Sequence, residues 1–349
     1  MLPLSVLEQA KAELTDFRGS GMSVMEISHR SDLYLEVAQC SELRLRKLLE
    51  IPDHYQILFL QGGATAQFAA VPLNLVEAQG RVAYVDTGIW SSKAIEEARR
   101  FTGEVIVAAS SASTGYTRLP VEEEWKDFDG AGYLHYTSNE TIGGLEFQSV
   151  PESAGIPLVC DMSSNLLSRP LDVSKFGLIY AGAQKNIGPS GITVVILRED
   201  LLKASASRAP RVLDYALQAQ NGSMLNTPPT YPWYLLNLVL EWLEAQGGVH
   251  AMERENLRKS ELLYRVIDQS SLFDNPMAQG SRSRMNIPFR IREASLTSMF
   301  LDEAREQGLV NLEGHRSVGG FRASLYNAMP FEGVELLASF LCDFDVRHG

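Results

Sequence analysis

The sequence contains few cysteines and no long apolar run, and both shortages limit what the protein can be. Its three cysteines are Cys40, Cys160 and Cys342. They lie far apart and form neither a metal-binding nor a disulfide pattern, which is typical of a reducing cytosol. The apolar runs fall short of the roughly 20 residues that a membrane-spanning helix needs. Residues 1–19 predict an amphipathic helix that contains acids, not a signal peptide, so we expect a cytoplasmic protein.

The chain is also short of basic residues, with 31 lysines and arginines against 43 aspartates and glutamates. The formal net charge of −12 argues against nucleic acid or an anionic membrane as a partner, because both are negatively charged. We see no internal repeat of about 20–50 residues, the period of solenoid proteins. Basic residues that gather in one place are therefore expected to bind a small anion.

Short, continuous apolar runs alternate with helical patterns over residues 55–197. The runs are 55–60, 81–86, 104–109, 132–137, 155–161, 177–183 and 191–197. Continuous apolar strands are buried on both faces, so they predict an α/β fold with a mostly parallel sheet that helices cover.

After a long predicted helix at 231–248, the pattern changes to helix, alternating strand, helix, strand and helix. We therefore predict a large domain, residues 1–247, and a smaller α+β domain, residues 248–349. The N-terminal segment is counted with the large domain but could pack against the small one.

Ligands of open parallel sheets bind beyond the carboxyl ends of the strands, so the residues that follow each run are candidate site residues. Lys185 follows one run and lies among small residues, in the segment "AGAQKNIGPSG" at 181–191. A solvated loop lysine would not need such neighbours, which allow a bulky group to approach the amine. Asp161 ends the preceding run; a buried acid there needs a positive partner unless it caps the next turn.

Three further strand ends carry candidate groups. The double glycine at 62–63 would direct the N–H groups of Ala64 and Thr65 at one anion, although a simple turn is the alternative. Trp90 follows 81–86 and Thr141 lies in a glycine-flanked turn; a core ring and a capping hydroxyl are the alternatives. An amine, an acid, an aromatic ring and a phosphate cradle are together what pyridoxal phosphate (PLP) requires.

Several segments resemble the class V aminotransferases, which are enzymes of PLP fold type I. The lysine segment 177–197 indicates the superfamily alone. Four other motifs are similar to the phosphoserine aminotransferases of that family: "SHR" (28–30), "NETIGG" (139–144), "NTPPT" (226–230) and "GHRSVGGFRASLYNAMP" (314–330). The resemblance covers nearly the whole chain.

The resemblance implies that PLP is the cofactor and that no metal takes part. The implied cofactor-binding residues are Ala64, Thr65, Trp90, Thr141, Asp161, Gln184, Lys185, Asn226 and Thr227. Of these, Lys185 would attach the cofactor and Asp161 would pair with its ring nitrogen, which makes these two the implied catalytic residues. Asn226 and Thr227 would complete the phosphate site of the neighbouring subunit, so the resemblance implies a homodimer with shared active sites.

The implied reaction is transfer of the amino group of L-glutamate to 3-phosphohydroxypyruvate, which gives O-phospho-L-serine and 2-oxoglutarate in serine biosynthesis. The corresponding phosphohydroxythreonine step of vitamin B6 synthesis is a related possibility. Arg322 would bind the α-carboxylate, and four residues would surround the distal anion: His29, Arg30, His315 and Arg316. Arginine suits carboxylate and phosphate alike, although a surface ion pair is the alternative for each one.

Two other hypotheses stay open: another class V enzyme, such as an alanine–glyoxylate-type aminotransferase or a cysteine desulfurase, and a catalytically impaired PLP-binding homologue. A desulfurase needs a cysteine on a mobile loop, whereas Cys160 falls in a predicted strand and Cys40 and Cys342 in predicted helices. Family members usually carry a segment similar to F-N-F-x-x-G-P-A ahead of the pair that stands here at Leu2–Pro3. If the protein lacks this part of the active-site wall, we expect lower activity.

Overall fold

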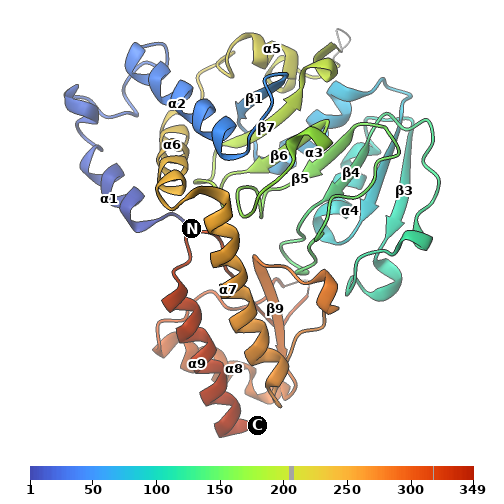
Figure 1. Cartoon of the computed structure of the whole chain (residues 1–349), viewed down its shortest axis with the longest axis vertical. Coiled ribbons are helices and arrows are strands. Elements are labelled where there is room, and N and C mark those ends of the chain that lie inside the picture. The colour runs from blue at the N-terminus through green and yellow to red at the C-terminus, as the bar shows by residue number, and fades with distance from the viewer. Residues whose placement is uncertain (204–207, 317) are drawn as a thin grey trace.

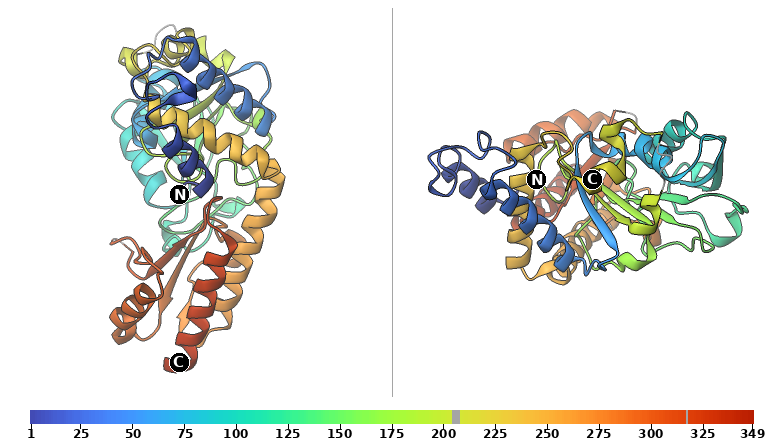
Figure 2. Two further views of the ribbon diagram at one scale, coloured as in Figure 1. Left: turned by 90° about the vertical axis from the view of Figure 1, so that its left-hand side faces the viewer. Right: turned by 90° about the horizontal axis from the view of Figure 1, so that it is seen from above.

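The computed structural model describes residues 1–203, 208–316 and 318–349, which form a large lobe and a smaller one (Figure 1). The strands of the large lobe are β1 (Tyr55–Leu60), β2 (Arg81–Asp86), β3 (Glu104–Ser110), β4 (Leu134–Thr137), β5 (Leu158–Asp161), β6 (Leu178–Gly182) and β7 (Thr193–Arg198). Its helices are α1 (Leu4–Ala12), α2 (Asp32–Leu48), α3 (Gly63–Leu75), α4 (Ile89–Ala98), α5 (Tyr215–Gln220) and α6 (Thr230–Ala245). The view turned by 90° about the vertical axis shows the same two lobes, with the small lobe below the large one (Figure 2, left).

The large sheet has the strand order β1-β7-β6-β5-β4-β2-β3. Only β7 runs against its neighbours: it pairs antiparallel with both β1 and β6, while the other pairs are parallel. The loop between β6 and β7 covers only residues 183–192, which is too short for the crossover that a parallel pair needs, so β7 returns antiparallel. The prediction of a mostly parallel sheet in an α/β fold is confirmed.

Helices cover both faces of this sheet, as the continuous apolar runs predict. In β1, Ile57 packs into the core under α2 and α6, while the next residue, Leu58, packs into the core under α3 and α4. β4, β5 and β6 are buried at every position. Both faces of the central strands are therefore buried, and two of the polar side chains within them pair with each other: His135 of β4 lies 2.8 Å from the hydroxyl of Tyr180 of β6.

The small lobe contains the helices α7 (Gly248–Gln269), α8 (Thr297–Glu306) and α9 (Phe331–His348). Its sheet has the order β10-β9-β8 and contains β8 (Phe273–Asp274), β9 (Asn286–Ile291) and β10 (Phe321–Ser324). The core is rich in phenylalanine, with Phe300 in ring contact with Phe273, Phe289 and Phe321. α7 runs from the large lobe down to the small sheet (Figure 1), and the domain boundary at 247/248 stays a prediction.

β9 differs from the alternating strand that the sequence predicts, because its first four residues are all buried. The reason is tertiary: the loop between β4 and β5 packs against this end of the small sheet. Asn139 of that loop donates to the side chain of Asn286 at 2.9 Å, and Ser283 donates to the carbonyl of Gly144 at 3.0 Å. Both faces of the strand are thereby covered.

Three buried asparagines join the two lobes, and we call them the asparagine seam: Asn186, Asn256 and Asn327. The backbone N–H of Asn327 donates to Asn186 Oδ1 at 2.9 Å. Asn256, on α7, donates to Asn327 Oδ1 at 2.8 Å and to the carbonyl of Ser168 at 3.1 Å. The seam fixes the segment after β10 against the residue that follows Lys185.

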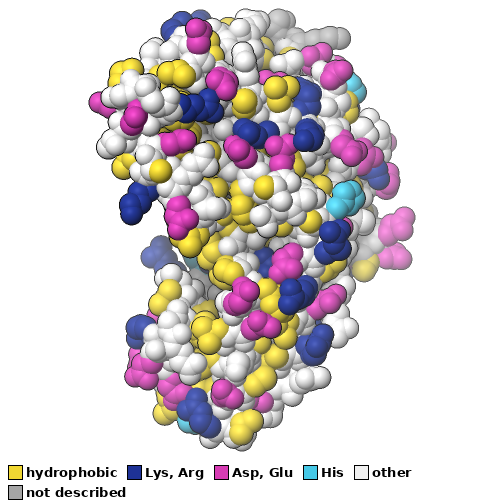
Figure 3. Space-filling view, turned by 60° about the vertical axis from the view of Figure 1, so that its left-hand side comes forward, with side chains coloured by type: hydrophobic (Ala, Val, Ile, Leu, Met, Phe, Trp, Pro, Cys, Tyr) yellow, Lys and Arg dark blue, Asp and Glu magenta, His cyan; other side chains and the backbone are white. Residues whose placement is uncertain are grey.

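Among the described residues, none of the helices has the length and apolar character to cross a membrane. Acidic and basic side chains are interspersed over the face drawn in Figure 3.

Candidate active site

The carboxyl ends of the parallel strands bring several candidate residues to one edge of the large sheet. Register places Thr137 of β4 beside Asp161 of β5, and Asp161 beside Tyr180 of β6. Lys185 follows β6 by three residues. The acid and the amine therefore come from adjacent strands and reach the same edge.

The amine of Lys185 is in contact with two of the other predicted residues. Its Nζ donates to Thr141 Oγ1 at 2.6 Å and lies 5.2 Å from the centre of the Trp90 ring. Burial lowers the pKa of Lys185, while the charges of Asp161 and Glu140 act in the opposite direction. A lowered pKa leaves more of the neutral amine, which is the form that attacks a carbonyl.

Asp161 is buried, and its carboxylate is held in place by the chain that follows it. Oδ1 accepts the backbone N–H of Ser163 at 2.8 Å. Burial raises the pKa of Asp161, and the charge of Lys185 and the bonds from Ser163 oppose that rise. A cationic ring nitrogen placed beside this carboxylate would relieve the cost of its burial.

The turn before α3 fits a phosphate group. Gly62, the residue before the helix, has φ +95°, and a Cβ added there would lie 2.5 Å from the Cβ of Ala66, so the turn requires glycine. α3 has no acidic residue in its first turn, and Gly62 has no side chain to cap it. The N–H groups of Ala64 and Thr65 at this helix start are therefore placed to meet an anion.

Trp90 lies in the first turn of α4, with its ring half-buried. Its Nε1 is buried and has no hydrogen-bond partner among the described residues. The Nζ of Lys93 lies 4.8 Å from the ring centre, close to the 5.2 Å of Lys185. The amine, buried acid, ring and uncapped helix start fit the cofactor that the sequence suggests.

The predicted substrate residues lie on three separate segments. Arg322 is on β10, and its buried Nε has no partner among the described residues, as expected of a group that meets an anion. His29 precedes α2, and its Nε2 is also buried without a hydrogen-bond partner among the described residues. Arg30 beside it is exposed, as are His315 and Arg316 in the loop before β10.

The remaining predicted cofactor residues, Gln184, Asn226 and Thr227, are all exposed. The carbonyl of Thr227 accepts the side-chain N–H of Gln61 at 3.2 Å, so this segment touches the turn before α3 within its own chain. The prediction that Asn226 and Thr227 serve a neighbouring subunit stays a prediction.

Sequence reasoning missed Ser163 and Glu140. Ser163 donates to Asp161 and its hydroxyl accepts the N–H of Gly182 at 3.0 Å; the polar run "MSSN" after Asp161 was the available signal. Glu140 is fully buried and contacts α4, and an acid in a turn gave no sign of this.

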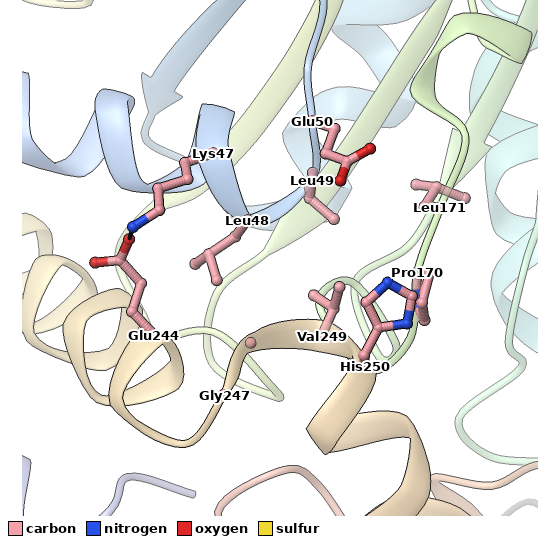
Figure 4. Close-up of a pocket in the computed structure, with 11 residues that line it drawn as sticks. Lys47, Leu48, Leu49, Glu50, Pro170, Leu171, Glu244, Gly247, Val249 and His250 are labelled. Atoms are coloured by element: carbon pink, nitrogen blue, oxygen red, sulfur yellow. Dashed lines mark hydrogen bonds and ion pairs between the residues drawn. The ribbon is translucent and has the colours of Figure 1, made fainter.

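A cavity of about 300 Å³ lies away from these residues, where the end of α2 meets the junction of α6 and α7 (Figure 4). Leu48, Leu49 and Val249 supply apolar walls. The charge of Lys47 at its rim is paired with Glu244 at 3.0 Å. It contains none of the predicted site residues.

Comparison with known proteins identifies the group to which these features belong. Residues 1–337 match the family model described as aminotransferase class-V. The chain is 58% identical over 348 residues to the phosphoserine aminotransferase of Pseudomonas paraeruginosa, with 100% of this chain and 96% of the relative covered.

Solved structures agree with that result. The phosphoserine aminotransferase of Bacillus circulans subsp. alkalophilus has a TM-score of 0.97 and 46% identity, with 100% of this chain and 97% of that chain covered. The PLP-bound enzyme of Trichomonas vaginalis has a TM-score of 0.94 and 40% identity, with 98% and 97% covered. The chain belongs to the class V aminotransferase family and, within it, to the phosphoserine aminotransferases.

Proposed function

We propose that the protein is a PLP-dependent enzyme that transfers the amino group of L-glutamate to 3-phosphohydroxypyruvate, giving O-phospho-L-serine and 2-oxoglutarate. The observation that carries the proposal is the cluster of Lys185, Asp161, Trp90 and Thr141 in a chain 58% identical over its whole length to a phosphoserine aminotransferase. The reaction belongs to serine biosynthesis, and we propose that it takes place in the cytoplasm.

PLP, when bound, supplies an electron-withdrawing ring that stabilises negative charge on the substrate's α-carbon. Asp161 would hold a positive ring nitrogen, and Trp90 would cover one face of the ring. Thr141 and Gln184 would donate to or accept from the ring's polar groups. Lys185 would attach the cofactor and then move a proton at the substrate's α-carbon, because a lowered pKa lets its amine both accept and return that proton.

We propose that the cofactor phosphate binds the N–H groups of Ala64 and Thr65, with Asn226 and Thr227 of a second copy completing the site. Their exposure supports a role at a surface that another chain covers. The active unit would then be a homodimer.

Substrate recognition is proposed to depend on cations at both ends of the substrate. Arg322 would bind the α-carboxylate that the amino acids and keto acids of this reaction share. The distal phosphate or carboxylate would lie among His29, Arg30, His315 and Arg316, and the unpartnered Nε2 of His29 supports this assignment. Arginine binds both anions through paired N–H groups.

A coupled assay with glutamate and 3-phosphohydroxypyruvate tests the proposal, with formation of 2-oxoglutarate as the readout. Formation of pyruvate from alanine and glyoxylate tests the alternative class V transferase, and release of sulfide from cysteine in the presence of a reducing thiol tests the desulfurase. The fixed positions of the cysteines count against the latter: Cys160 lies within β5, Cys40 within α2 and Cys342 within α9. Turnover of 4-phosphohydroxythreonine would show that the enzyme also catalyses the corresponding step of vitamin B6 synthesis.

A further inference from the structure

Glu140, which lies between Asn139 and Thr141 in the loop after β4, is one of the most deeply buried acids in the described part of the chain. Its side chain is 0% exposed. Oε2 accepts the backbone N–H of Trp90 at 3.0 Å, and Oε1 accepts the N–H of Ser91 at 2.9 Å. Both donors belong to the first turn of α4, where helical N–H groups have no partner within the helix.

The chain around Glu140 is built to admit this carboxylate. Gly88 precedes α4, and a Cβ added there would lie 2.7 Å from the Glu140 side-chain carboxyl carbon. Gly88 therefore has no side chain that could cap α4. The carboxylate of Glu140, from the loop after β4, caps the helix instead. A negative charge at a helix start is stabilised by the helix dipole, which offsets part of the cost of burial.

The same short segment reaches Lys185 by two routes. Glu140 binds the backbone of Trp90, whose ring lies 5.2 Å from the Lys185 Nζ. The hydroxyl of the next residue, Thr141, accepts a hydrogen bond from the Lys185 Nζ at 2.6 Å. A shift of the Glu140 carboxylate would therefore move both groups that contact the amine.

We propose that Glu140 is a positioning residue that fixes Trp90 and Thr141 around the Lys185 amine. The proposal extends the proposed function, since it assigns to a residue outside the reacting groups the task of shaping the lysine site. The positioning role of Glu140 is tested on the cofactor-free chain. It can therefore be wrong while the proposed reaction is right, and it can be right while the proposed reaction is wrong.

Glu146 offers a matched control in the same loop. It is also 0% exposed, but its carboxylate pairs with Arg284 at 2.9 Å and accepts the N–H of Arg284 at 2.7 Å. Glu146→Gln therefore removes an equally buried charge without touching α4 or Lys185.

The experiment compares Glu140→Gln, Glu140→Asp and Glu146→Gln as full-length, cofactor-free protein. Hydrogen exchange of the peptide that contains Trp90 and Ser91 measures the helix start. Labelling of Lys185 with acetic anhydride, followed by mass spectrometry across pH 6–10, measures the amine. The charged groups that bear on Lys185 are Asp161, Glu140, Arg322 and the amino group of Met1, which donates to the Lys185 carbonyl.

In Glu140→Gln we expect faster exchange at the start of α4 and labelling of Lys185 about threefold faster or more at fixed pH. Glu140→Asp keeps the charge but loses reach, so exchange should rise as in Glu140→Gln, and labelling of Lys185 should change less than in Glu140→Gln, because only the positions of Trp90 and Thr141 are altered. Glu146→Gln should change neither quantity at these sites. Unchanged exchange and labelling in Glu140→Gln, or equal changes in Glu146→Gln, would overturn the proposal.

Should Glu140→Gln fail to fold, Gly88→Ala displaces the carboxylate without removing its charge. It should raise exchange at the start of α4 by the same route. Unchanged exchange in a folded Gly88→Ala protein would equally overturn the proposal.

Discussion

The amine of Lys185 lies 2.6 Å from the hydroxyl of Thr141, although 43 residues separate the two in the sequence. Thr141 belongs to the loop after β4 and Lys185 to the loop after β6, so the two meet across the end of β5. Asp161 occupies that end. The contact therefore depends on the alignment of the carboxyl ends of β4, β5 and β6.

Lys185→Ala should abolish both the visible absorbance of bound cofactor and amino transfer. Proton transfer by a positioned group typically contributes about 10²- to 10⁴-fold, and the attachment of the cofactor is lost as well. Lys93→Ala is the control, because the Lys93 amine also lies near the Trp90 ring, at 4.8 Å. An activity loss in Lys93→Ala as large as that in Lys185→Ala would show that the roles have been assigned to the wrong lysine.

Asp161→Asn should lower the pKa of Lys185 further, because the carboxylate of Asp161 favours the charged amine. At a fixed pH below the wild-type midpoint, labelling of Lys185 in cofactor-free protein should be about tenfold faster or more. Asp86→Asn is the control. Asp86 is also the last residue of a strand, but its carboxylate accepts hydrogen bonds from the hydroxyls of Ser92 and Tyr116. An unchanged labelling midpoint in Asp161→Asn would contradict the electrostatic coupling.

Arg322→Ala should raise KM for glutamate and for 3-phosphohydroxypyruvate alike, because both carry an α-carboxylate. Arg316→Ala should raise KM more for the phosphorylated substrate, whose distal group carries more charge. Loss of one charge-assisted hydrogen bond costs about 1.5–3 kcal/mol, or roughly ten- to a hundredfold in affinity. Equal losses for both substrates in Arg316→Ala would favour a class V enzyme without a phosphate-selective pocket.

Asn226 and Thr227 should act on the partner's cofactor. A Lys185→Ala chain mixed with an Asn226→Ala/Thr227→Val chain should regain activity, since some mixed dimers contain one site with neither lesion. The measurement is the coupled assay after subunit exchange, with each variant alone as its control. Activity that fails to return would indicate that the phosphate site is completed within one chain, as the contact of Thr227 with Gln61 would allow.

The burial of Lys259 should make the free energy of unfolding depend on pH. It is 0% exposed and donates to the carbonyls of Leu325, Tyr326 and Met329. Burial lowers its pKa to about 8, while the unfolded chain should have the ordinary value. Between these two values the unfolded state binds more protons, so deprotonation stabilises the fold as pH rises.

The wild type should therefore gain about 2 kcal/mol in unfolding free energy relative to Lys259→Met between pH 7.5 and pH 9.5. Urea unfolding at the two pH values measures this difference. Lys11→Met, which removes an exposed lysine, should show no such gain. A difference that stays constant with pH would mean that Lys259 keeps an ordinary pKa in the fold.

The central sheet could be predicted because continuous apolar runs permit few other structures, and the cluster around Lys185 because strand ends share one edge. The direction of β7 could not be predicted from its composition, since an apolar run carries no information about the direction of its neighbours. Glu140 was missed for a related reason. Acids in turns usually face solvent, and its burial depends on N–H groups that lie 50 residues earlier in the sequence.

The asparagine seam has a consequence for how the chain can be divided. Asn327 completes hydrogen bonds of Asn186 in the large lobe and of Asn256 in α7. A protein cut before α7 would leave the amide of Asn186 without this partner, and the separated small lobe would expose Asn327 and its neighbours to water. Neither half is therefore expected to be expressed as a stable fragment, and limited proteolysis between α6 and α7 should yield pieces that stay associated until the fold is denatured.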